Sequence, residues 1–491
     1  MSARRFGLVV SVLLAGCMVG PSYHAEQVVP DSTRVGAGHI SDSARIFFDS
    51  LAKARREDSL KALNVVPVAP HRVFPDSIAD LQWLQILNDS VLTGLVNLAM
   101  RQNRDLAVAR ARINEYRAEV GVAQAPLYPS LAANGSASKN KVVFGGGPAI
   151  QYDALRLTGD VAWELDFWGL TRRGVQAAKA DQAAQEALER ATVLSLVSDV
   201  ATGYLTLLEL DQEQAASDQT LATRTQTLDL ARQRYSHGLI SELDVRQFEA
   251  QVAVPAAQLA RVQSQRAQTE HALDVLLGQG PTAIPRGGSL ETAARAVIVP
   301  DSLPSSLLAR RPDVQQAEQN YIAAMARIGV ADAARYPAFY ITGSYGYQST
   351  TLSRLIIPNA NIYQLQGGFS LPLFSGNAIT EEIRAARARA EQARGRYEQA
   401  VLAALQDAGD ALAQVRASRD QVLANETQTI ALRRAFELAD MRYRRGVAGY
   451  LEVLTAQQGL FVAQIALSQA ELEELAAAVR LYKALGGSWT R

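Results

Sequence analysis

Two patterns of hydrophobic positions run along this chain, and each occurs twice. In one, apolar and polar residues alternate, as in residues 155–167, where the odd positions are almost all apolar (Leu155, Leu157, Gly159, Val161, Trp163, Leu165 and Phe167). In the other, apolar residues step by three and four over very long stretches, as in residues 171–236. The first pattern predicts two-faced strands, and the second predicts long helices that pack along one seam as coiled coils.

Both patterns recur because the sequence repeats itself at an offset of 208 residues, the distance from Tyr128-Pro129 to Tyr336-Pro337. The same offset joins further identical residues: Asp105 with Asp313, Gly121 with Gly329, Gly135 with Gly343, Tyr235 with Tyr443, Gly238 with Gly446 and Leu243 with Leu451. A constant offset over so much of the chain indicates an internal duplication.

Each copy has the same order of parts: a helix of about 35 residues, a strand, a loop, a second strand, a very long helix, a tight turn and a return helix. We expect the first repeat at residues 81–280, with a strand pair at 127–168 and a helical tip near 235–244. The long helix, at 171–236, would measure about 100 Å at about 1.5 Å per residue. That is far longer than a globular core requires.

The second repeat is expected at residues 305–486, with a strand pair at 336–374, a long helix at 377–444 and a tip near 443–452. Residues 281–304 would link the two repeats, and residues 487–491 would form a C-terminal tail.

The strands are the segments that could cross a membrane. Amphipathic strands of about 9 to 11 residues suit a transmembrane barrel, because every backbone amide in hydrocarbon must be paired, and after residue 16 no run of about 18 apolar residues exists. A soluble sandwich would show the same alternation. Four strands cannot close a barrel, for which about eight is the practical minimum, so a barrel would require several copies. Asp160, Glu164 and Asp166 lie on the charged face and are expected to face the lumen.

Composition narrows the possible partners. The chain has 491 residues, 48% of them hydrophobic and only 7% aromatic, and its 49 Lys and Arg equal its 49 Asp and Glu. This balance leaves no large basic field to attract nucleic acid.

The N-terminus indicates export and lipidation. Residues 1–16 have the charged and apolar parts of a signal peptide, and Leu14-Ala15-Gly16-Cys17 resembles a bacterial lipobox. Cys17, the only cysteine of the chain, is therefore the expected lipid anchor, and residues 17–80 would form an anchored N-terminal arm and linker. Met18 follows Cys17, whereas an aspartate there favours inner-membrane retention, so we expect the outer membrane.

Residues that would support catalysis or a metal are scattered. The five histidines, His24, His39, His71, His237 and His271, have no ligand-like spacing. Gly145-Gly146-Gly147 lacks the lysine of a phosphate loop. We therefore expect neither an enzyme nor a metal site.

Five motifs carry a family resemblance: Cys17 to Tyr23, Trp163 to Gly169, Arg310 to Val314, Arg442 to Gly446 and Tyr482 to Gly487. Apart from the first motif, the resemblance covers roughly residues 80–488. The chain resembles the TolC-type outer-membrane factors, and more closely their OprM/NodT-like lipoprotein branch. It departs from that branch at Trp168, where the family more often has a smaller apolar residue.

The resemblance implies a homotrimer in which twelve strands form one barrel in the outer membrane and the helices form a tunnel across the periplasm. Such a duct passively exports small molecules that it receives from an inner-membrane pump, here of the RND type, through a periplasmic adaptor. The resemblance implies no cofactor beyond the covalent lipid on Cys17. A conduit for type I protein secretion and a non-channel periplasmic coiled-coil lipoprotein are the alternatives.

By the same resemblance, the two helical tips close the tunnel. The candidate gate residues are Tyr235, Asp244, Tyr443, Arg444, Arg445 and Glu452. The two acids and the two tyrosines match family positions. Ala448 stands where some relatives have an arginine that bonds to the neighbouring turn, and Arg444, Arg445 and Arg442 are the candidates to substitute for it. Around a threefold axis the carboxylates would form acidic rings that select against anions. The alternative is that these are ordinary solvated turn residues.

Overall fold

The computed structural model describes residues 18–23, 34–36, 89–143, 145–290, 302–304, 310–447 and 449–487. The signal segment, Cys17 and most of the predicted arm lie outside these residues. The chain forms two compact units, and each takes parts of both repeats. The first, called here the sheet unit, comprises Met1–Gln27, Arg110–Leu188 and Gln315–Ala400; the second, the hairpin unit, comprises Val28–Ala109, Glu189–Val314 and Val401–Arg491.

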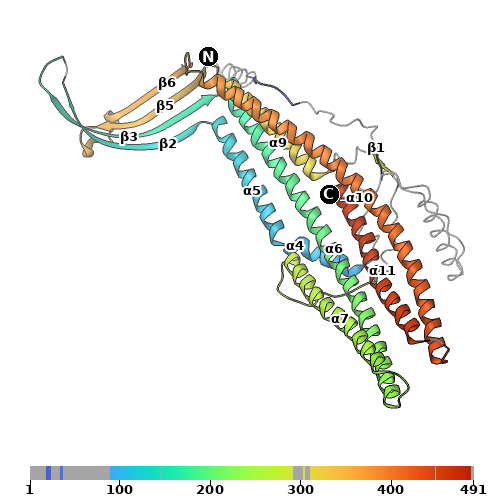
Figure 1. Cartoon of the computed structure of the whole chain (residues 1–491). Helices are drawn as coiled ribbons and strands as arrows, with labels where there is room; N and C mark the ends of the chain where they lie inside the picture. The colour runs from blue at the N-terminus through green and yellow to red at the C-terminus, as the bar shows by residue number, and fades with distance from the viewer. Residues whose placement is uncertain are drawn as a thin grey trace. The chain divides into compact units, whose positions relative to one another are not determined.

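A four-stranded antiparallel sheet dominates the sheet unit (Figure 1). Its strands, in the order β2-β3-β5-β6, are Ser130–Val142, Ile150–Leu165, Ala338–Ser349 and Asn361–Ser370. The hairpin β2–β3 comes from the first repeat and the hairpin β5–β6 from the second, and β3 pairs with β5 to join them. The two copies therefore build one continuous sheet.

The register preserves the two-faced pattern across this whole sheet. Leu131 pairs with Val161, Leu157 with Tyr347 and Phe339 with Phe369, so odd-numbered residues always meet odd-numbered residues. Side chains at paired positions project from the same face, and the apolar positions of all four strands therefore share one face. Many of them are exposed, including Tyr363 at 82% and Leu365 at 80%. The predicted alternation is confirmed.

The helices follow the predicted order. The first repeat contains α4 (Ser90–Gln102), α5 (Arg104–Gln124), α6 (Leu170–Ser236) and α7 (Glu242–Leu277), and the second contains α9 (Pro312–Ala333), α10 (Ala378–Arg444) and α11 (Tyr450–Ala484). Each long helix begins within one residue of its predicted start, because a seam sustained over so many turns is a strong local signal.

The first helix of the first repeat is not continuous, so that prediction was wrong. Asn103 leaves helical geometry at ψ 132° and separates α4 from α5. Its side chain caps α5 by accepting a hydrogen bond from the Leu106 amide at 2.9 Å. The side-chain Nδ2 of Asn103 also donates to the Leu276 carbonyl at 3.0 Å, so a contact with α7 fixes the break.

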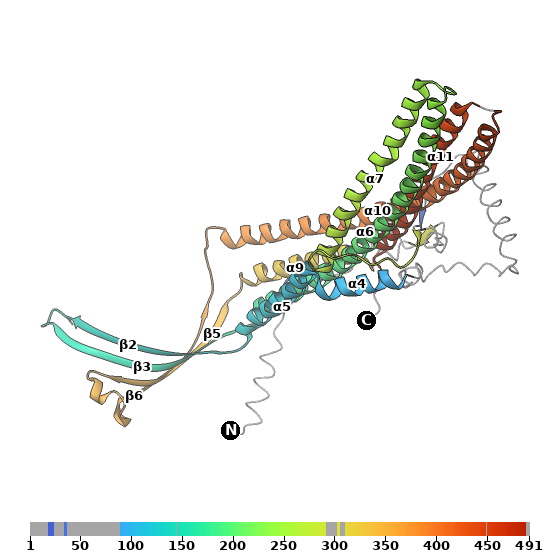
Figure 2. The same ribbon diagram turned by 90° about the horizontal axis from the view of Figure 1, so that it is seen from below.

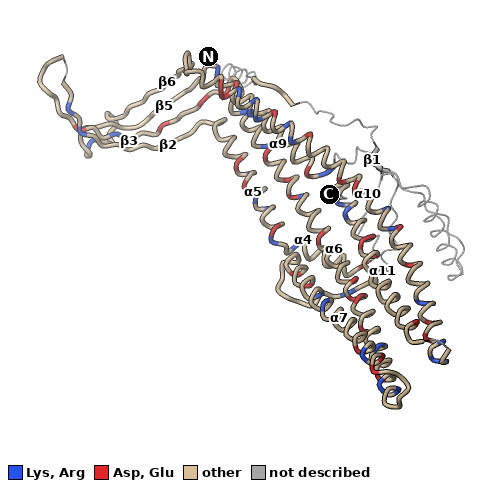
Figure 3. Tube along the Cα trace, viewed as in Figure 1, with Lys and Arg blue, Asp and Glu red and all other residues tan. Residues whose placement is uncertain are grey.

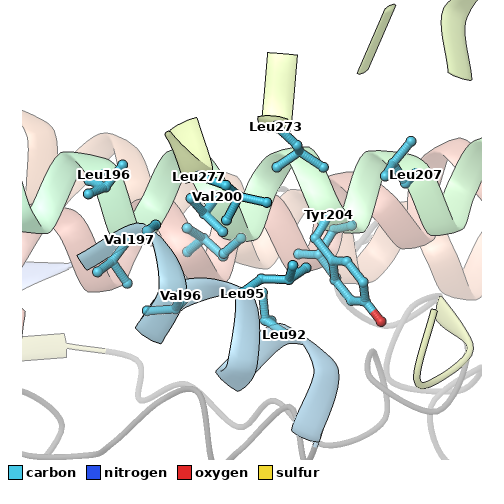
Figure 4. Close-up of a cluster of buried hydrophobic side chains, with 14 of the residues drawn as sticks. Leu92, Leu95, Val96, Leu196, Val197, Val200, Tyr204, Leu207, Leu273 and Leu277 are labelled. Atoms are coloured by element: carbon cyan, nitrogen blue, oxygen red, sulfur yellow. The ribbon is translucent and has the colours of Figure 1, made fainter. Parts of the chain in front are cut away.

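The core of the hairpin unit lies where α4 and α7 pack on α6 (Figure 4). Leu92 and Leu95 point from α4 toward Val200 and Tyr204 of α6, and Leu273 approaches from α7. Each of these side chains is nearly inaccessible to solvent. Burial of one such side chain contributes about 1.5–3 kcal/mol, so this cluster anchors the unit.

One 18-residue window of α6 has a mean hydropathy of 1.5, which is apolar enough to cross a membrane by length and composition. However, 61% of that window is buried inside the protein. This is the signature of a core helix rather than a lipid-facing one.

The described residues of the predicted linker 281–304 contact the hairpin unit. Ile284 and Leu290 are buried in the hairpin-unit core, and the Gly288 amide donates to Asp89 at 3.0 Å. Further on, β4 (Ser302–Pro304) pairs with β1 (Arg34–Gly36) of the N-terminal arm.

Candidate sites in the sheet and at the helical tips

Polar side chains on the even face of the sheet bond to one another across strands. Asp160 accepts hydrogen bonds from Asn134 at 2.6 Å and from Thr158 at 3.2 Å. Glu164 lies on the same face, opposite Tyr340, and is exposed. Asp160 and Glu164 thus share the face that alternation assigned to a lumen, and the lumen itself remains a prediction.

Asp166 is a correction to the sequence-based strand. β3 ends at Leu165, so Asp166 lies outside it. Its carboxylate accepts the backbone amides of Thr171 at 3.2 Å and Arg172 at 2.9 Å, and it pairs with the Arg172 guanidinium at 3.1 Å. These contacts cap the first turn of α6, and alternation gives no reason to place this carboxylate in a lumen.

The residues directly after Cys17 dock on the sheet unit. The Val19 amide donates to the Trp168 carbonyl at 3.1 Å. The buried Arg173 donates to the carbonyls of Val19 at 3.0 Å and Gly20 at 2.9 Å. The segment Met18–Tyr23 is therefore bound at the point where β3 gives way to α6.

Two further contacts hold this segment against α9. Gly20, at φ +94°, lies so close to Gly329 that a Cβ on Gly20 would clash with the Gly329 Cα. Tyr23 donates to Glu318 at 2.7 Å and meets the Tyr321 ring edge to face, with centroids 5.7 Å apart. Burial, and then the bond to Glu318, raise the pKa of the Tyr23 hydroxyl above its usual range.

An aromatic pair lies beside the docked segment. Trp168 stacks on Tyr336 with ring centroids 4.7 Å apart and donates from Nε1 to the Pro337 carbonyl at 2.9 Å. Both rings line a cavity of about 250 Å³. Trp168, the residue that departs from the family pattern, thus links the end of β3 to the start of β5.

The first helical tip, between α6 and α7, is a well-capped turn. Gly238 adopts φ +72°, which glycine tolerates best. Ser241 and Asp244 form a capping box, in which Asp244 accepts the Ser241 amide at 2.9 Å and hydroxyl at 2.8 Å. These hydrogen bonds hold the pKa of Asp244 below its ordinary value. This candidate gate residue therefore has a structural role within its own turn.

The second tip, between α10 and α11, has more loosely held charges. Glu452 lies 3.8 Å from the Arg442 guanidinium, and Arg444 pairs with Asp440 at 2.8 Å. Arg445 is exposed. Figure 3 shows charged positions of both signs along the helices, the tips included, whereas the sheet is mostly uncharged.

The two hairpins lie side by side in the hairpin unit (Figures 1 and 2), and their tips touch. Arg234 of α6 donates from Nη1 to the Tyr443 hydroxyl of α10 at 2.6 Å, with its guanidinium 5.1 Å from the ring centroid. Tyr235, the neighbouring candidate, is 45% exposed. Of the candidate gate residues, Tyr443 is thus the one that bonds across hairpins in the described part of the chain.

Aromatic packing supports this contact. Tyr450 lies with its ring centroid 3.8 Å from that of Phe248 and 5.7 Å from that of Tyr443. Farther from the tips, the buried Arg224 lies 5.6 Å from the Phe461 ring and donates to the Gln251 carbonyl at 2.8 Å. Sequence reasoning missed this cluster. The one available signal was the Arg-Tyr pair, which occurs at both tips.

Among the residues that the structure describes, no three His, Cys, Asp or Glu side chains converge as metal ligands would.

The family described as outer membrane efflux protein matches this chain twice, over residues 95–279 and over residues 303–487. The second match begins and ends 208 residues after the first, which is the offset of the sequence repeat. Each match therefore coincides with one copy of the duplicated unit.

Individual relatives agree. The toluene efflux pump outer membrane protein TtgC of Pseudomonas putida is 34% identical over 427 residues, covering 84% of this chain and 86% of that protein. The probable outer membrane lipoprotein SilC of Salmonella typhimurium is 29% identical over 416 residues, covering 84% and 89%. The open state of the Neisseria gonorrhoeae MtrE outer membrane channel has a TM-score of 0.79 at 26% identity, covering 96% of this chain and 98% of that one.

Proposed function

The chain belongs to the outer membrane efflux protein family, and we propose that three copies of it form the outer-membrane duct of a tripartite efflux system. It is an outer-membrane protein with the fold of the TolC-type channels. In the proposed duct the chain is a passive conduit with no catalytic activity and no cofactor. An inner-membrane pump of the RND type and a periplasmic adaptor deliver the substrate.

The open sheet carries this proposal. Within the described residues, the outer edges of β2 and β6 pair with no further strand, and the apolar face is exposed. An exposed apolar face with open edges is unstable in water and cannot be left open in lipid. Three copies joined edge to edge give twelve strands, which exceeds the practical minimum of about eight. The apolar face then meets lipid, and Asp160 and Glu164 line the lumen.

The proposed cargo is small organic molecules rather than protein. TtgC is named as part of a toluene efflux pump, and SilC is named as a lipoprotein, which matches the lipobox that ends at Cys17. Both names favour the efflux branch over a conduit for protein secretion.

The proposed lipid anchor is Cys17. The docked segment supports it, because the bonds of Val19 to Trp168 and Arg173 hold the chain next to the end of β3. Acyl chains on the preceding cysteine would then enter the same membrane leaflet as the end of the barrel. Mass spectrometry of the mature protein should show a lipidated N-terminal Cys17 with residues 1–16 removed. An unmodified Cys17 thiol would contradict this assignment.

Reconstitution tests the duct. The full-length protein in planar bilayers should give discrete conductance steps, and native mass spectrometry in detergent should give a mass of three chains. Restoring the gene to a deletion strain should lower the retention of a hydrophobic fluorescent dye. A monomeric protein without conductance would rule out the duct, and a trimeric channel that leaves dye retention unchanged would rule out small-molecule efflux.

A further inference from the structure

The contact between Arg234 and Tyr443 joins the two halves of a duplicated sequence. Each of these residues has its counterpart 208 residues away: Arg234 corresponds to Arg442, and Tyr443 corresponds to Tyr235. Each tip therefore carries the same Arg-Tyr pair. Within one chain, the arginine of the first tip uses the tyrosine of the second, while Arg442 and Tyr235 do not meet as a hydrogen-bonded pair in the described chain.

Both remaining residues present accessible groups. The Tyr235 ring is 45% exposed. The Arg442 side chain is 58% exposed and, among the described residues, makes a long ionic contact of 3.8 Å with Glu452. A guanidinium has five N–H donors in a fixed fork, so the Glu452 contact leaves donors for a second acceptor. Arg442 and Tyr235 are thus the counterparts of a hydrogen-bonded pair, and each has a group available for the equivalent bond.

We propose that Arg442 donates to the hydroxyl of Tyr235 of the partner subunit, so that the arginine–tyrosine contact recurs between neighbouring chains. This inference rests on the proposed trimer. In a ring of three duplicated chains, first and second hairpins alternate, six in all. The rotation that moves a first hairpin onto the second hairpin of its own chain also moves that second hairpin onto the first hairpin of the next chain. The operation that carries Arg234 to Arg442 also carries Tyr443 to Tyr235 of the partner subunit.

The contacts that support the intrachain pair are lost at this second seam. By the same offset, the counterpart of Phe248 is Ala456 and the counterpart of Tyr450 is Glu242, so the aromatic stack is absent at this seam. The counterpart of Arg224 is Leu432 and the counterpart of Phe461 is Ala253, so the contact of a buried guanidinium with an aromatic ring is absent too. The seam between chains therefore lacks both of these supports for its arginine–tyrosine contact, and it is the weaker of the two seams at the tips.

Cross-linking with a short bismaleimide tests the contact in detergent-purified, full-length protein. The pair Tyr235→Cys with Arg442→Cys should produce covalent dimers and trimers on a denaturing gel. The matched control, Arg234→Cys with Tyr443→Cys, should cross-link within one chain and run as a monomer. Each single-cysteine variant reports any background from Cys17.

Native mass spectrometry of the same samples separates the two ideas. If the protein is trimeric and the control pair reacts, but the Tyr235 and Arg442 pair yields only monomers, the seam contact is wrong and the duct survives. If no trimer exists, the proposed function fails first.

A hydroxyl deletion tests the difference in strength. Tyr235→Phe should raise the open-to-closed ratio of single channels by about fivefold, because it removes a hydrogen bond to a charged donor at the unsupported seam. Tyr443→Phe should change this ratio by less than about twofold, since the aromatic stack remains. Equal effects, or a larger effect of Tyr443→Phe, would show that the seam between chains is not the weaker one.

Discussion

Arg311 donates a hydrogen bond from Nη1 to the carbonyl oxygen of Ala484 at 2.9 Å. The duplicate of this contact exists in the first repeat, where Asn103 donates to the Leu276 carbonyl at 3.0 Å. Both donors and both acceptors are 208 residues apart. Asn103 directly precedes α5, and Arg311 directly precedes α9. In each repeat, this hydrogen bond therefore ties the start of that helix to the end of the return helix, α7 or α11.

Arg311 should contribute more than Asn103 to the stability of the hairpin unit. It is buried and also pairs with Asp313 and Asp407 at 2.8 Å each. Arg311→Leu should therefore destabilise the protein by about 2–3 kcal/mol, whereas Asn103→Ala should cost about 1–2 kcal/mol. Thermal unfolding in detergent measures both variants, and equal melting temperatures would contradict this ranking.

Glu209 should make stability depend on pH. It is buried, and Oε1 has no hydrogen-bond partner in the described structure. Burial, and then the neighbouring Glu213, raise its pKa to about 7, while Arg261 acts in the opposite direction. The folded chain then retains a proton that the unfolded chain releases near pH 4.5. Stability should be greatest below that pH and fall as pH rises through about 7.

Glu209→Gln should remove this dependence, because the amide does not titrate. Melting temperatures measured from pH 5 to pH 8 should fall for the wild-type chain and for the exposed control Glu437→Gln, and stay flatter for Glu209→Gln. Parallel curves for all three proteins would exclude Glu209 as the source.

The two faces of β6 should respond oppositely to a charge. Leu365 lies on the apolar face opposite Gly343, and Gln366 lies on the polar face opposite Thr342. Leu365→Arg should lower the yield of folded protein in the outer membrane, since an arginine facing lipid costs about 2–4 kcal/mol near the midplane. Gln366→Arg should leave the yield unchanged and shift ion preference toward anions. Reversed effects would mean that the face assignment is wrong.

The candidate gate acid Asp244 needs a test that separates charge from capping. Asp244→Ala should raise conductance if its carboxylate restricts the tip, but it also removes the capping box, which is worth about 1 kcal/mol. Ser241→Ala removes the serine side of that box and keeps the carboxylate. Conductance in planar bilayers should therefore rise in the first variant and not in the second. An equal rise in both would assign the effect to the cap.

Two equivalent glycines should differ in their tolerance of a methyl group. A Cβ on Gly329 would lie 2.9 Å from the Val19 carbonyl oxygen, whereas a Cβ on Gly121, its counterpart 208 residues earlier, would meet nothing within 4 Å. Gly329→Ala should release the segment Met18–Tyr23 and speed proteolysis near the N-terminus. Gly121→Ala should be neutral or stabilise its helix by up to about 1 kcal/mol. Identical proteolysis rates would contradict the docking contact.

Much of the fold could be predicted because its signals are local. The steps of three and four along the helical seams and the alternation of the strands are periodicities that neighbouring residues create by themselves. The start of α10 at Ala378 and the apolar face that contains Leu365 followed directly from them. The helix break at Asn103 and the end of β3 before Asp166 did not, because each is fixed by side-chain hydrogen bonds that periodicity does not encode.

The sequence by itself determined the duplication, the order of strands and helices, and the side of the sheet on which each side chain lies. Only the tertiary structure decided which distant residues meet. Arg234 and Tyr443 are 209 positions apart, and Met18–Tyr23 docks on residues far along the chain. The physical reason is that a repeat specifies equivalent elements, whereas contacts between them depend on packing. Packing is therefore what brought Tyr443 to Arg234, whereas the bonds between Ser241 and Asp244 are local to their own turn.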